Sequence, residues 1–513
     1  MNNYSRVGIK ELTEARLDAN YYAPRFLENE KILAQCGLSR KRIIEVSGLC
    51  NCGATPVDVT YSNEGLGLVR TSDVRPDYFR AERVLRTKDL DLSDLRESVI
   101  ARPGDLLYTM SGTIGYACVI PDDEMPVSFS NTIARVRIPK QSPYDAHYIA
   151  VFFNCHYGYE QSLRLVSGGM QGHVMPNPFK ELLVALPNSV AQKYIGDKVR
   201  QAERLRAWAK LAETHVNQYH QKLVPQQTGL DFAKRVRVVS PARMSERLDA
   251  HFYPGVVDEY LRLHQGKFKQ LGKLCATIYN GQTQPETAGS ASCKQITVTN
   301  LSSSFLGGTP RDVEAPVKKE KFLKAYDILM CNAAHNKSYI GKDLTFVHSE
   351  AAILPSTEVM AIRVDRNQVP SSYIRAYLLT KLGYVQIQST IRGITAHSYP
   401  DDMALLDIYA PEVADKDKEE WFACDEKLAL AGKACEVATQ LTNAAKLLVE
   451  ALIEGQLTEA ELLTAEKALQ AGNDRLDRVI LSRLNTDGID GQGPALFGDL
   501  DELYQLLSLA EGE

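Results

Sequence analysis

Residues 104–115, GDLLYTMSGTIG, combine glycines with threonines and a serine, a composition that is typical of loops that bind phosphate. A nucleotide-binding loop needs its glycines between a strand and a helix, and a Walker loop also needs Gly-Lys-Ser or Gly-Lys-Thr. This segment has no lysine and leads into an apolar run. We therefore predict a strand over 106–110, a tight turn at Ser111-Gly112-Thr113 and a second strand over 114–120.

The ten cysteines give only a weak metal-binding pattern. Cys50 and Cys52 lie close together, but neither a second pair nor a spaced pair of histidines accompanies them. A structural zinc site needs about four such ligands. We therefore expect no metal site, no bound cofactor, and scattered thiols in a reducing compartment.

Sequence patterns that are typical of catalysis are missing as well. Asn177-Pro178-Phe179 lacks the second proline of an amino-methyltransferase motif, and no glycine-rich cofactor loop precedes it. The chain has no H-E-x-x-H or G-x-S-x-G motif. His173, His335 and His397 stand alone in polar loops, which is more typical of surface or DNA-facing side chains than of catalysis. We expect a non-catalytic protein; an enzyme whose active site has no linear motif is the less favoured alternative.

The charges are unevenly divided along the chain, whose formal net charge is −5. Residues 412–513 hold nine Lys and Arg against 22 Asp and Glu, so residues 1–411 carry a net charge of +8. Residues 188–244 hold 11 basic against four acidic side chains. This basic segment is compatible with a nucleic-acid partner, but a solvated helix face would have the same composition.

The chain contains a long internal repeat. EARLDANYYAP at 14–24 returns as SERLDAHFYPG at 245–255, an offset of 231 residues. Three further pairs follow in the same order: GDLLYTM (104–110) with YDILMCN (326–332), HYIAVFF (147–153) with SYIRAYL (372–378), and 167–187 with 389–411. A period this long indicates a duplicated domain rather than a solenoid.

Each copy is followed by a long segment that is rich in helix formers and free of internal proline, at 191–223 and 415–455. Apolar residues in the second segment step by four and three, as in a coiled coil. The first keeps this spacing less regularly, because Arg206, Glu213 and His220 interrupt it. We expect the two helices to pair antiparallel, which buries both seams; the alternative is an amphipathic helix packed on its own domain.

The fold class is therefore predicted to be α+β, with two duplicated domains of short strands, each followed by a long helix. The predicted boundaries are a first domain at 1–187, a first long helix at 188–228, a second domain at 229–411, a second long helix at 412–455 and an acidic helical C-terminal extension at 456–513. A chain of 513 residues is too long for a single core.

No stretch approaches the roughly 20 apolar residues of a membrane helix. The region MNNYSRVGIKELTEARLD is charged throughout and contains no apolar signal-peptide core. We therefore expect a cytoplasmic protein that does not bind membranes.

Three segments carry a resemblance to a known family. They are Gly104-Asp105-Leu106-Leu107 with Gly112-Thr113-Ile114-Gly115, the Gly168-Gly169-Met170-Gln171 loop that runs to a strand ending at Pro187, and the closing helix 448–455, LVEALIEG. Together with the duplication, they make residues 10–455 resemble the specificity subunits of type I DNA restriction-modification systems. That resemblance implies two target recognition domains separated by an antiparallel pair of helices.

The resemblance also implies a function: sequence-specific recognition of double-stranded DNA in a type I-like restriction-modification or methylation-associated phage-defence complex. Each domain would recognise one half of a bipartite site, and catalysis would come from methyltransferase subunits, with a restriction or translocase subunit as an optional further partner. A spacer helix of about 35 residues is roughly 50 Å long, enough to set two half-sites about one DNA turn apart. The alternative from another class is an adaptor of a phage-defence complex that does not bind DNA.

Recognition of base edges and phosphates needs polar and basic side chains on loops that a rigid scaffold holds. The candidates in the first domain are Arg70, Thr71, Ser72, Arg75, Ser111, Thr113, Ser167, Gln171 and His173. Those in the second domain are Thr297, Thr299, Asn300, His335, Asn336, Lys337, Arg392, Thr395 and His397. For each of them, an ordinary turn or surface residue is the alternative interpretation.

The long helices are also expected to dock partner subunits through exposed apolar faces. The candidate contact residues are Ile195, Val199, Leu430, Val437, Leu441 and Leu448. For the acidic extension, a partner-docking element, an autoinhibitory element and a solvated appendage stay open as alternatives.

Overall fold

The structure is a computed structural model of the chain. It describes residues 16–76, 78–168, 172–233, 247–287, 292–316, 321–350 and 352–512, with isolated positions at 7–9, 12, 239, 241 and 244. The chain forms two compact units: unit 1 contains residues 1–205 and 437–513, and unit 2 contains residues 206–436.

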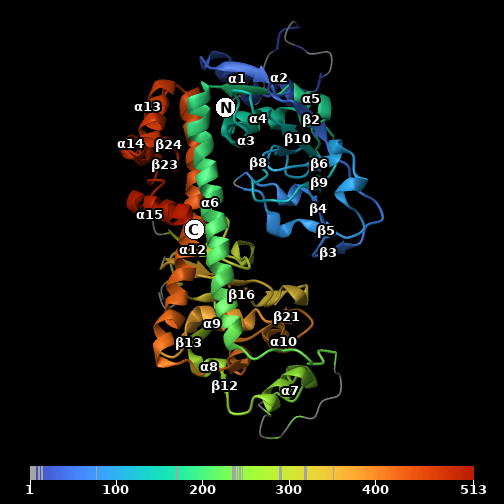
Figure 1. The fold of residues 1–513 in the computed structure, drawn as a ribbon, viewed down its shortest axis with the longest axis vertical. Coiled ribbons are helices and arrows are strands. Elements are labelled where there is room, and N and C mark those ends of the chain that lie inside the picture. The colour runs from blue at the N-terminus through green and yellow to red at the C-terminus, as the bar shows by residue number, and fades with distance from the viewer. Residues whose placement is uncertain are drawn as a thin grey trace. The chain divides into compact units, whose positions relative to one another are not determined.

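The first of the two duplicated domains, in unit 1, contains one four-stranded and one five-stranded sheet (Figure 1). The four-stranded sheet has the order β2 (Leu49–Cys52), β10 (Ile133–Arg137), β7 (Leu106–Thr109) and β8 (Ala117–Val119). The five-stranded sheet has the order β3 (Tyr61–Ser62), β5 (Leu85–Thr87), β4 (Leu66–Val69), β9 (Val127–Phe129) and β6 (Ile100–Ala101). Strand β1 (Ser39–Arg42) pairs with β11 (Leu183–Leu186), and the helices are α1 (Pro24–Gln35), α2 (Ile43–Val46), α3 (Ala146–Asn154), α4 (His156–Arg164) and α5 (Pro176–Lys180).

The second duplicated domain, in unit 2, repeats this plan. Its four-stranded sheet has the order β13 (Cys275–Asn280), β20 (Val359–Val364), β16 (Ile328–Cys331) and β18 (Leu344–Phe346). Two smaller sheets contain β15 (Arg311–Glu314), β14 (Ser292–Ile296) and β19 (Ile353–Pro355), and β17 (Ala333–Ala334) with β21 (Ala396–His397). Strand β12 (Phe268–Gln270) pairs with β22 (Asp407–Tyr409), and the helices are α7 (Gly255–Leu263), α8 (Leu271–Leu274), α9 (Ser371–Leu378), α10 (Lys381–Ser389) and α11 (Pro400–Ala404).

The glycine-containing segment that suggested a phosphate loop is a strand pair. Strands β7 and β8 are antiparallel, with Leu106 opposite Val119. Gly112 and Gly115 in the connection have φ values of +71° and +88°, a region that favours glycine. The predicted strand, turn and strand are thus confirmed, although the second strand begins at Ala117 rather than at Ile114.

The repeated Asp of Gly-Asp-Leu-Leu and Tyr-Asp-Ile-Leu explains why this motif recurs. Asp105 binds the Arg137 guanidinium through both oxygens, at 2.6 and 2.7 Å, and Asp327 binds Arg363 in the same way, at 2.8 and 2.7 Å. Both carboxylates are buried, so each needs such a partner. The residue before each Asp has a positive φ, +82° at Gly104 and +71° at Tyr326, so the tyrosine adopts the conformation of the glycine.

The repeated Arg-Leu-Asp-Ala segment also makes the same contacts in both units. Arg16 Nη1 donates to the Leu165 carbonyl at 3.2 Å. Arg247 Nη1 donates to the Thr390 carbonyl at 3.0 Å. Each arginine also pairs with the Asp two positions later, at 2.7 and 2.8 Å. The segment therefore ties the start of each duplicated domain to the residues that follow its fourth helix, α4 or α10.

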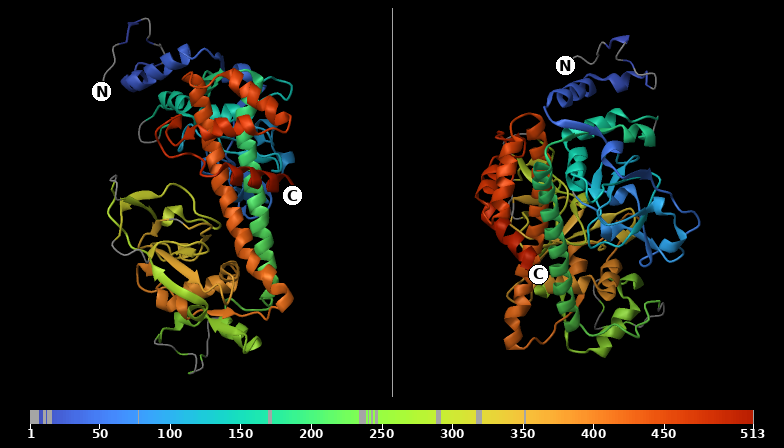
Figure 2. Two further views of the ribbon diagram at one scale, coloured as in Figure 1. Left: turned by 90° about the vertical axis from the view of Figure 1, so that its left-hand side faces the viewer. Right: turned by 45° about the horizontal axis from the view of Figure 1, so that its top comes forward.

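Two long helices, α6 (Ser189–Leu223) and α12 (Asp415–Ile453), follow the two duplicated domains. In unit 1 the first part of α6 lies beside the last part of α12, and in unit 2 the last part of α6 lies beside the first part of α12 (Figure 1 and Figure 2). The helices therefore run in opposite directions, which confirms the predicted antiparallel pair.

Two of the polar residues that interrupt the apolar seam of α6 bind the second duplicated domain instead. Glu213 accepts a hydrogen bond from Arg375 of α9 at 2.6 Å, and the Arg375 side chain is fully buried. His220 Nε2 lies 2.9 Å from the hydroxyl of Ser372. Burial lowers the pKa of His220 to about 3, so this imidazole is neutral. These residues fix α9 on α6 within unit 2.

The acidic extension consists of α13 (Glu459–Gln470), α14 (Arg475–Ser482), the short strands β23 (Leu484–Asn485) and β24 (Gly488–Ile489), and α15 (Leu500–Gly512). Within unit 1, Asp477 of α14 accepts hydrogen bonds from Lys198 Nζ, both at 2.7 Å. The hydroxyls of Tyr194 and Tyr504 donate to the same carboxylate. Because Lys198 and Asp477 are both 1% exposed, the extension is a packed part of unit 1 and not a solvated appendage.

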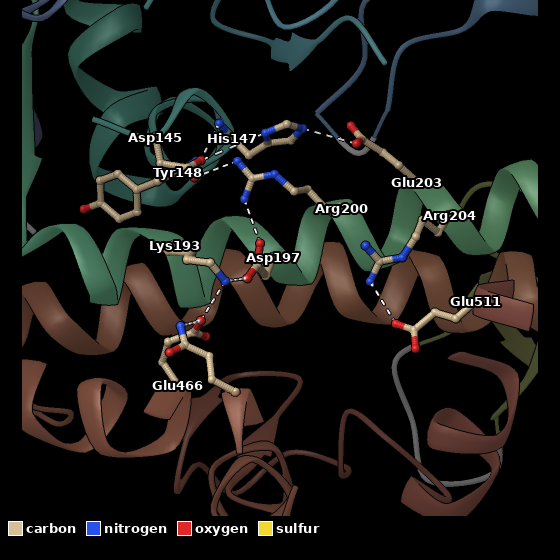
Figure 3. A network of polar contacts seen from close by, with 11 residues as sticks. Asp145, His147, Tyr148, Lys193, Asp197, Arg200, Glu203, Arg204, Glu466 and Glu511 are labelled. Atoms are coloured by element: carbon tan, nitrogen blue, oxygen red, sulfur yellow. Dashed lines mark hydrogen bonds and ion pairs between the residues drawn. The ribbon is translucent and has the colours of Figure 1, made fainter. Parts of the chain in front are cut away.

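Figure 3 shows that the first half of α6 carries charged side chains toward two different partners. Arg200 pairs with Asp145, the N-cap residue of α3, at 2.6 Å, which links α6 to the first duplicated domain. Lys193 pairs with Glu466 of the extension at 2.6 Å. Acidic residues of the extension thus neutralise part of the basic segment that the sequence contains at 188–244.

Candidate nucleic-acid interface

In unit 1 a chain of backbone hydrogen bonds brings the predicted DNA-binding loops to one edge of the domain. Ser130 N donates to Val69 O at 3.0 Å, and Met110 N donates to Thr132 O at 2.9 Å. Val174 N then donates to Met110 O at 2.8 Å. The loops that begin at residues 70, 111 and 167 therefore lie together, although more than 90 positions separate the first from the last in the sequence. We call this surface loop edge 1.

Unit 2 contains the same chain of hydrogen bonds at matching positions. Ser356 N donates to Ile296 O at 2.9 Å, Asn332 N donates to Glu358 O at 3.0 Å, and Ser398 N donates to Asn332 O at 2.8 Å. The loops that begin at residues 297, 333 and 392 form the corresponding loop edge 2. The duplicated scaffold thus holds three loops in each unit, and the loops themselves differ in sequence and conformation.

Five of the predicted residues in the first domain are brought together at loop edge 1. Ser111 and Ser167 each form a β-bridge with His173. Thr113 Oγ1 donates to the Thr71 carbonyl at 3.5 Å, a long hydrogen bond. His173 is exposed, and the other four are partly exposed. Gln171 was predicted for the same site and lies outside the described residues.

The remaining candidates of the first domain, Arg70, Ser72 and Arg75, surround a short turn. The buried Asp73 accepts a hydrogen bond from the Arg70 backbone at 2.8 Å and from the Ser72 hydroxyl at 2.8 Å. The Arg70 guanidinium lies 3.5 Å from Asp73, and its side chain is 46% exposed, so this ion pair is weak. Arg70 is available for a ligand, whereas the Ser72 hydroxyl already holds the turn.

Asn300 corrects one sequence prediction for the second domain. Its side chain is 5% exposed. The amide oxygen accepts from the Thr297 backbone at 3.0 Å, and the amide nitrogen donates to the Gly307 carbonyl at 2.9 Å. Asn300 therefore takes the place that Asp73 has in the first domain and holds a turn instead of offering an amide to a base edge. Thr297 and Thr299 lie on this turn, and their hydroxyls are 2.8 Å apart.

The loop 333–339 contributes three exposed candidates, His335, Asn336 and Lys337. Asn336 Oδ1 accepts from the Ser338 backbone at 3.0 Å and so caps the 3-10 helix Lys337–Tyr339. The Asn336 amide nitrogen and the Lys337 ammonium face outward on a loop whose conformation this cap fixes.

The third loop of edge 2 is the hairpin 392–397, which holds Arg392, Thr395 and His397. It pairs through β21 with β17, so Ala333 lies opposite His397. Arg392 Nε donates to Asp402 Oδ2 at 2.7 Å, and its Nη2 donates to the other oxygen. The Nε/Nη2 edge of the guanidinium is therefore engaged in supporting the hairpin, while the side chain stays 47% exposed. The hydrogen bond to Asp402 also raises the pKa of Arg392.

Hydroxyl and amide pairs beside both loop edges were missed from the sequence. In unit 1 the Thr55 hydroxyl lies 3.0 Å from Asn131 Oδ1, and in unit 2 the hydroxyls of Thr283 and Thr357 lie 2.9 Å apart. All four residues are exposed on the strand ends that carry the loops. The signal that could have found them is the aligned position of Asn131 and Thr357 in the two copies.

The apolar residues predicted to dock partner subunits occupy other surroundings. Ile195, Val437, Leu441 and Leu448 are all 2% exposed or less and pack within unit 1. The prediction of an exposed apolar face is therefore wrong for these four, because the seam is used within the chain. Val199 is partly exposed and Leu430 is 37% exposed. A partner can contact only the outer faces of the helices.

Two further properties bear on the kind of site. Among the residues that the structure describes, no three His, Cys, Asp or Glu side chains are grouped as metal ligands. Within the same residues, no helix combines the length and the apolar character that a bilayer span requires.

Three solved structures that are similar to this chain come from type I restriction-modification systems. The S subunit from M. genitalium is aligned over 84% of this chain and 96% of its own, with 13% identity and a TM-score of 0.34. A chain from a structure that describes the complex assembly and conformational transition of the type I R-M system is aligned over 82% of this chain and 98% of its own. Its identity is 16% and its TM-score is 0.28. The HsdS subunit from Thermoanaerobacter tengcongensis is aligned over 82% and 97%, with 17% identity and a TM-score of 0.27.

No protein-family model and no curated protein matches the chain. The three solved structures belong to the family that the sequence resembles. At these identities and TM-scores, they assign no role to an individual residue of this chain.

Proposed function

We propose that this chain is the DNA-recognition subunit of a type I-like restriction-modification or methylation-associated phage-defence complex. The observation that carries the proposal is the pair of loop edges: one scaffold, built twice with the same backbone hydrogen bonds, holds two different sets of side chains. Unit 1 presents Arg70, Ser111 and His173, and unit 2 presents Thr299, Lys337 and His397. Two related domains with unlike loops suit a DNA site with two unlike halves.

The side chains at both edges are suited to duplex DNA. Lys and Arg bind phosphates, while Asn, Ser, Thr and His exchange hydrogen bonds with base edges. Loops that are tied to strand ends lose little conformational entropy on binding, which favours sequence discrimination. In this proposal each recognition domain contacts one half of a bipartite site and performs no chemistry itself.

Catalysis in the proposed complex comes from partner proteins. Methyltransferase subunits would bind the outer faces of α6 and α12, and a restriction or translocase subunit would join them in a complete restriction system. The proposal includes no cofactor for this chain.

The salt dependence of binding tests whether the partner is DNA. Phosphate contacts release counterions, so the logarithm of the binding constant should fall linearly with the logarithm of salt concentration, by about 0.9 per contact. The chain, purified with its methyltransferase partners, should show this fall on duplexes selected from a random pool, and Lys337→Gln should reduce the slope by about one unit. Lys269→Gln, an exposed lysine on β12, is the matched control and should leave the slope unchanged.

Binding that is absent at every salt concentration would contradict the proposal. It would favour an adaptor whose duplicated domains bind protein.

A further inference from the structure

Loop edge 2 displays one large aliphatic side chain that packs against nothing in its own unit. Ile394 is 104% exposed, the highest value of any large hydrophobic residue among those the structure describes. Burying an isoleucine side chain is worth about 1.5–3 kcal/mol, so a ligand that covered Ile394 would gain free energy from this contact.

The hairpin that carries Ile394 is braced at its stem. Arg392 N donates to His397 O at 2.8 Å, and His397 N donates to Arg392 O at 3.1 Å. One residue beyond the stem, the Ser398 hydroxyl lies 2.7 Å from the Thr390 hydroxyl. Gly393 has a φ of +79°, which allows the tight reversal that places Ile394 at the tip.

A buried carboxylate anchors the hairpin to the rest of the domain. Asp402 is 2% exposed and binds both Arg392 and, at 3.2 Å, Arg247 of the repeated Arg-Leu-Asp-Ala segment. The Arg392 guanidinium also lies 5.7 Å from the ring centroid of Tyr399, whose ring stacks on that of His397 at 6.3 Å. These contacts hold the stem in one conformation and keep the tip away from the domain surface.

The groups around the tip identify the ligand that it fits. Thr395 and His397 lie on the same hairpin as Ile394, and Asn336 and Lys337 lie on the loop that follows β17, the strand that pairs with β21 of the hairpin. The major groove of DNA admits a two-stranded ribbon, whereas the minor groove is only about half as wide. Among the groups that base edges expose in the major groove, the 5-methyl group of thymine is the apolar one.

We propose that Ile394 recognises a thymine in the half-site of the second recognition domain by packing against its 5-methyl group. The proposal rests on the proposed DNA-recognition function and adds a residue and a base to it. Arg392, Asp402 and Arg247 act as positioning residues that hold the hairpin, while Thr395 and Lys337 contact the neighbouring base edge and phosphate. The corresponding tip in the first domain, 169–171, lies outside the described residues.

The test removes one partner of the contact at a time: the 5-methyl group of thymine in the DNA, or the Ile394 side chain in the protein. The wild-type complex and an Ile394→Ala complex each select duplexes from a random pool, and the selected site is then synthesised with deoxyuridine in place of each thymine in turn. For the wild-type complex, one deoxyuridine in one half-site should weaken binding about fourfold, the effect of exposing one methyl group. For Ile394→Ala, the same replacement should change binding by less than about 1.5-fold, and selection should lose its preference for thymine at that position.

Leu263→Ala is the matched control, because Leu263 is a 66% exposed aliphatic residue at the end of α7 in the same unit. It should keep both the affinity and the sensitivity to deoxyuridine of the wild-type complex. Thermal unfolding of all three proteins reports whether a variant has lost its fold.

Three other outcomes would overturn the proposal. An Ile394→Ala complex that keeps the sensitivity to deoxyuridine would place the thymine contact elsewhere. An Ile394→Ala complex whose affinity falls equally for every DNA sequence would indicate an apolar wedge between base pairs rather than a methyl contact. An Ile394→Ala complex that binds as tightly as wild type would leave the tip without a role. A wild-type complex that selects no DNA would instead contradict the proposed function, so the two failures are distinguishable.

Discussion

Replacement of Asp477 by Asn should destabilise unit 1 strongly. Asp477 and Lys198 are both 1% exposed, and the variant would leave the Lys198 ammonium buried without its counter-charge. Removing one partner of a buried ion pair costs about 3–5 kcal/mol, because the remaining charge stays desolvated. The hydroxyls of Tyr194 and Tyr504, which now donate to the carboxylate, would have to share an amide oxygen. We expect a loss of at least about 3 kcal/mol in the free energy of unfolding.

An exposed ion pair between α6 and another helix of the extension provides the control. Arg204 of α6 and Glu511 of α15 lie 3.4 Å apart, but their side chains are 46% and 62% exposed. Glu511→Gln should therefore change the free energy of unfolding by less than about 1 kcal/mol. Urea denaturation followed by circular dichroism, with limited proteolysis of the extension, measures both variants. The reasoning is refuted if Asp477→Asn is as stable as Glu511→Gln.

The acid sensitivity of the Asp477 contact follows from the same geometry. Burial alone would raise the pKa of Asp477, but Lys198 and the two tyrosines more than offset it and hold the pKa below its ordinary value. A carboxyl whose pKa is lower in the folded state stabilises the fold above its unfolded pKa of about 3.9. This contribution is lost as the pH falls through the folded value. The extension should therefore stay packed at pH 5, and Asp477→Asn should remove the acid-dependent step below pH 4.

Three further predictions concern the scaffold of the recognition domains. Burial lowers the pKa of His220 to about 3, so below about pH 6.5 the unfolded chain binds a proton that the folded chain does not. As the pH falls below 6.5, this group should lower the free energy of unfolding by up to about 1.4 kcal/mol per pH unit. Urea titrations of the His220→Gln variant should lack this dependence on pH. Gly104→Ala meets no atom within 4 Å but must adopt a φ of +82°, so we expect a cost of about 1–2 kcal/mol in thermal unfolding, and an unchanged melting temperature would contradict it. Asn300→Ala should lower the free energy of unfolding by about 1–3 kcal/mol, because it removes two hydrogen bonds of a buried turn. Asn336→Ala, at an exposed position, should lower it by less than about 1 kcal/mol. Equal values from calorimetry would show that the turn does not depend on Asn300.

The duplicated plan could be predicted because it depends on patterns that stay close in the sequence. The strand pair at 106–120 follows from its own apolar and turn residues, and each long helix follows from its spacing of apolar side chains. The antiparallel pairing was also predictable, since burial of two seams leaves few alternatives.

The use of individual polar side chains could not be predicted, because it depends on partners that only the fold brings near. Arg392 has the chemistry to bind guanine, but the turn into α11 brings Asp402 against it. Asn300 is an amide on a predicted loop, but its turn encloses it. Spacing alone also cannot tell whether an apolar seam packs within the chain, as Leu441 and Leu448 do, or against another protein.

The packing of the extension could not be predicted either. Its sequence indicates amphipathic, acidic helices but does not indicate that they pack against α6. The clue was complementary charge: residues 456–513 hold 12 acidic against four basic side chains, and residues 188–244 are basic. Asp477 and Lys198 are 279 positions apart, so only the fold pairs them.

The central claim is that this chain selects a bipartite DNA site for methylation. Long-read mapping of modified bases in host DNA, with and without the gene and with the neighbouring genes intact, tests it most directly. The account predicts one methylated motif with two separated halves that disappears when the gene is deleted and returns when it is restored. An identical map of modified bases in the two strains would contradict it.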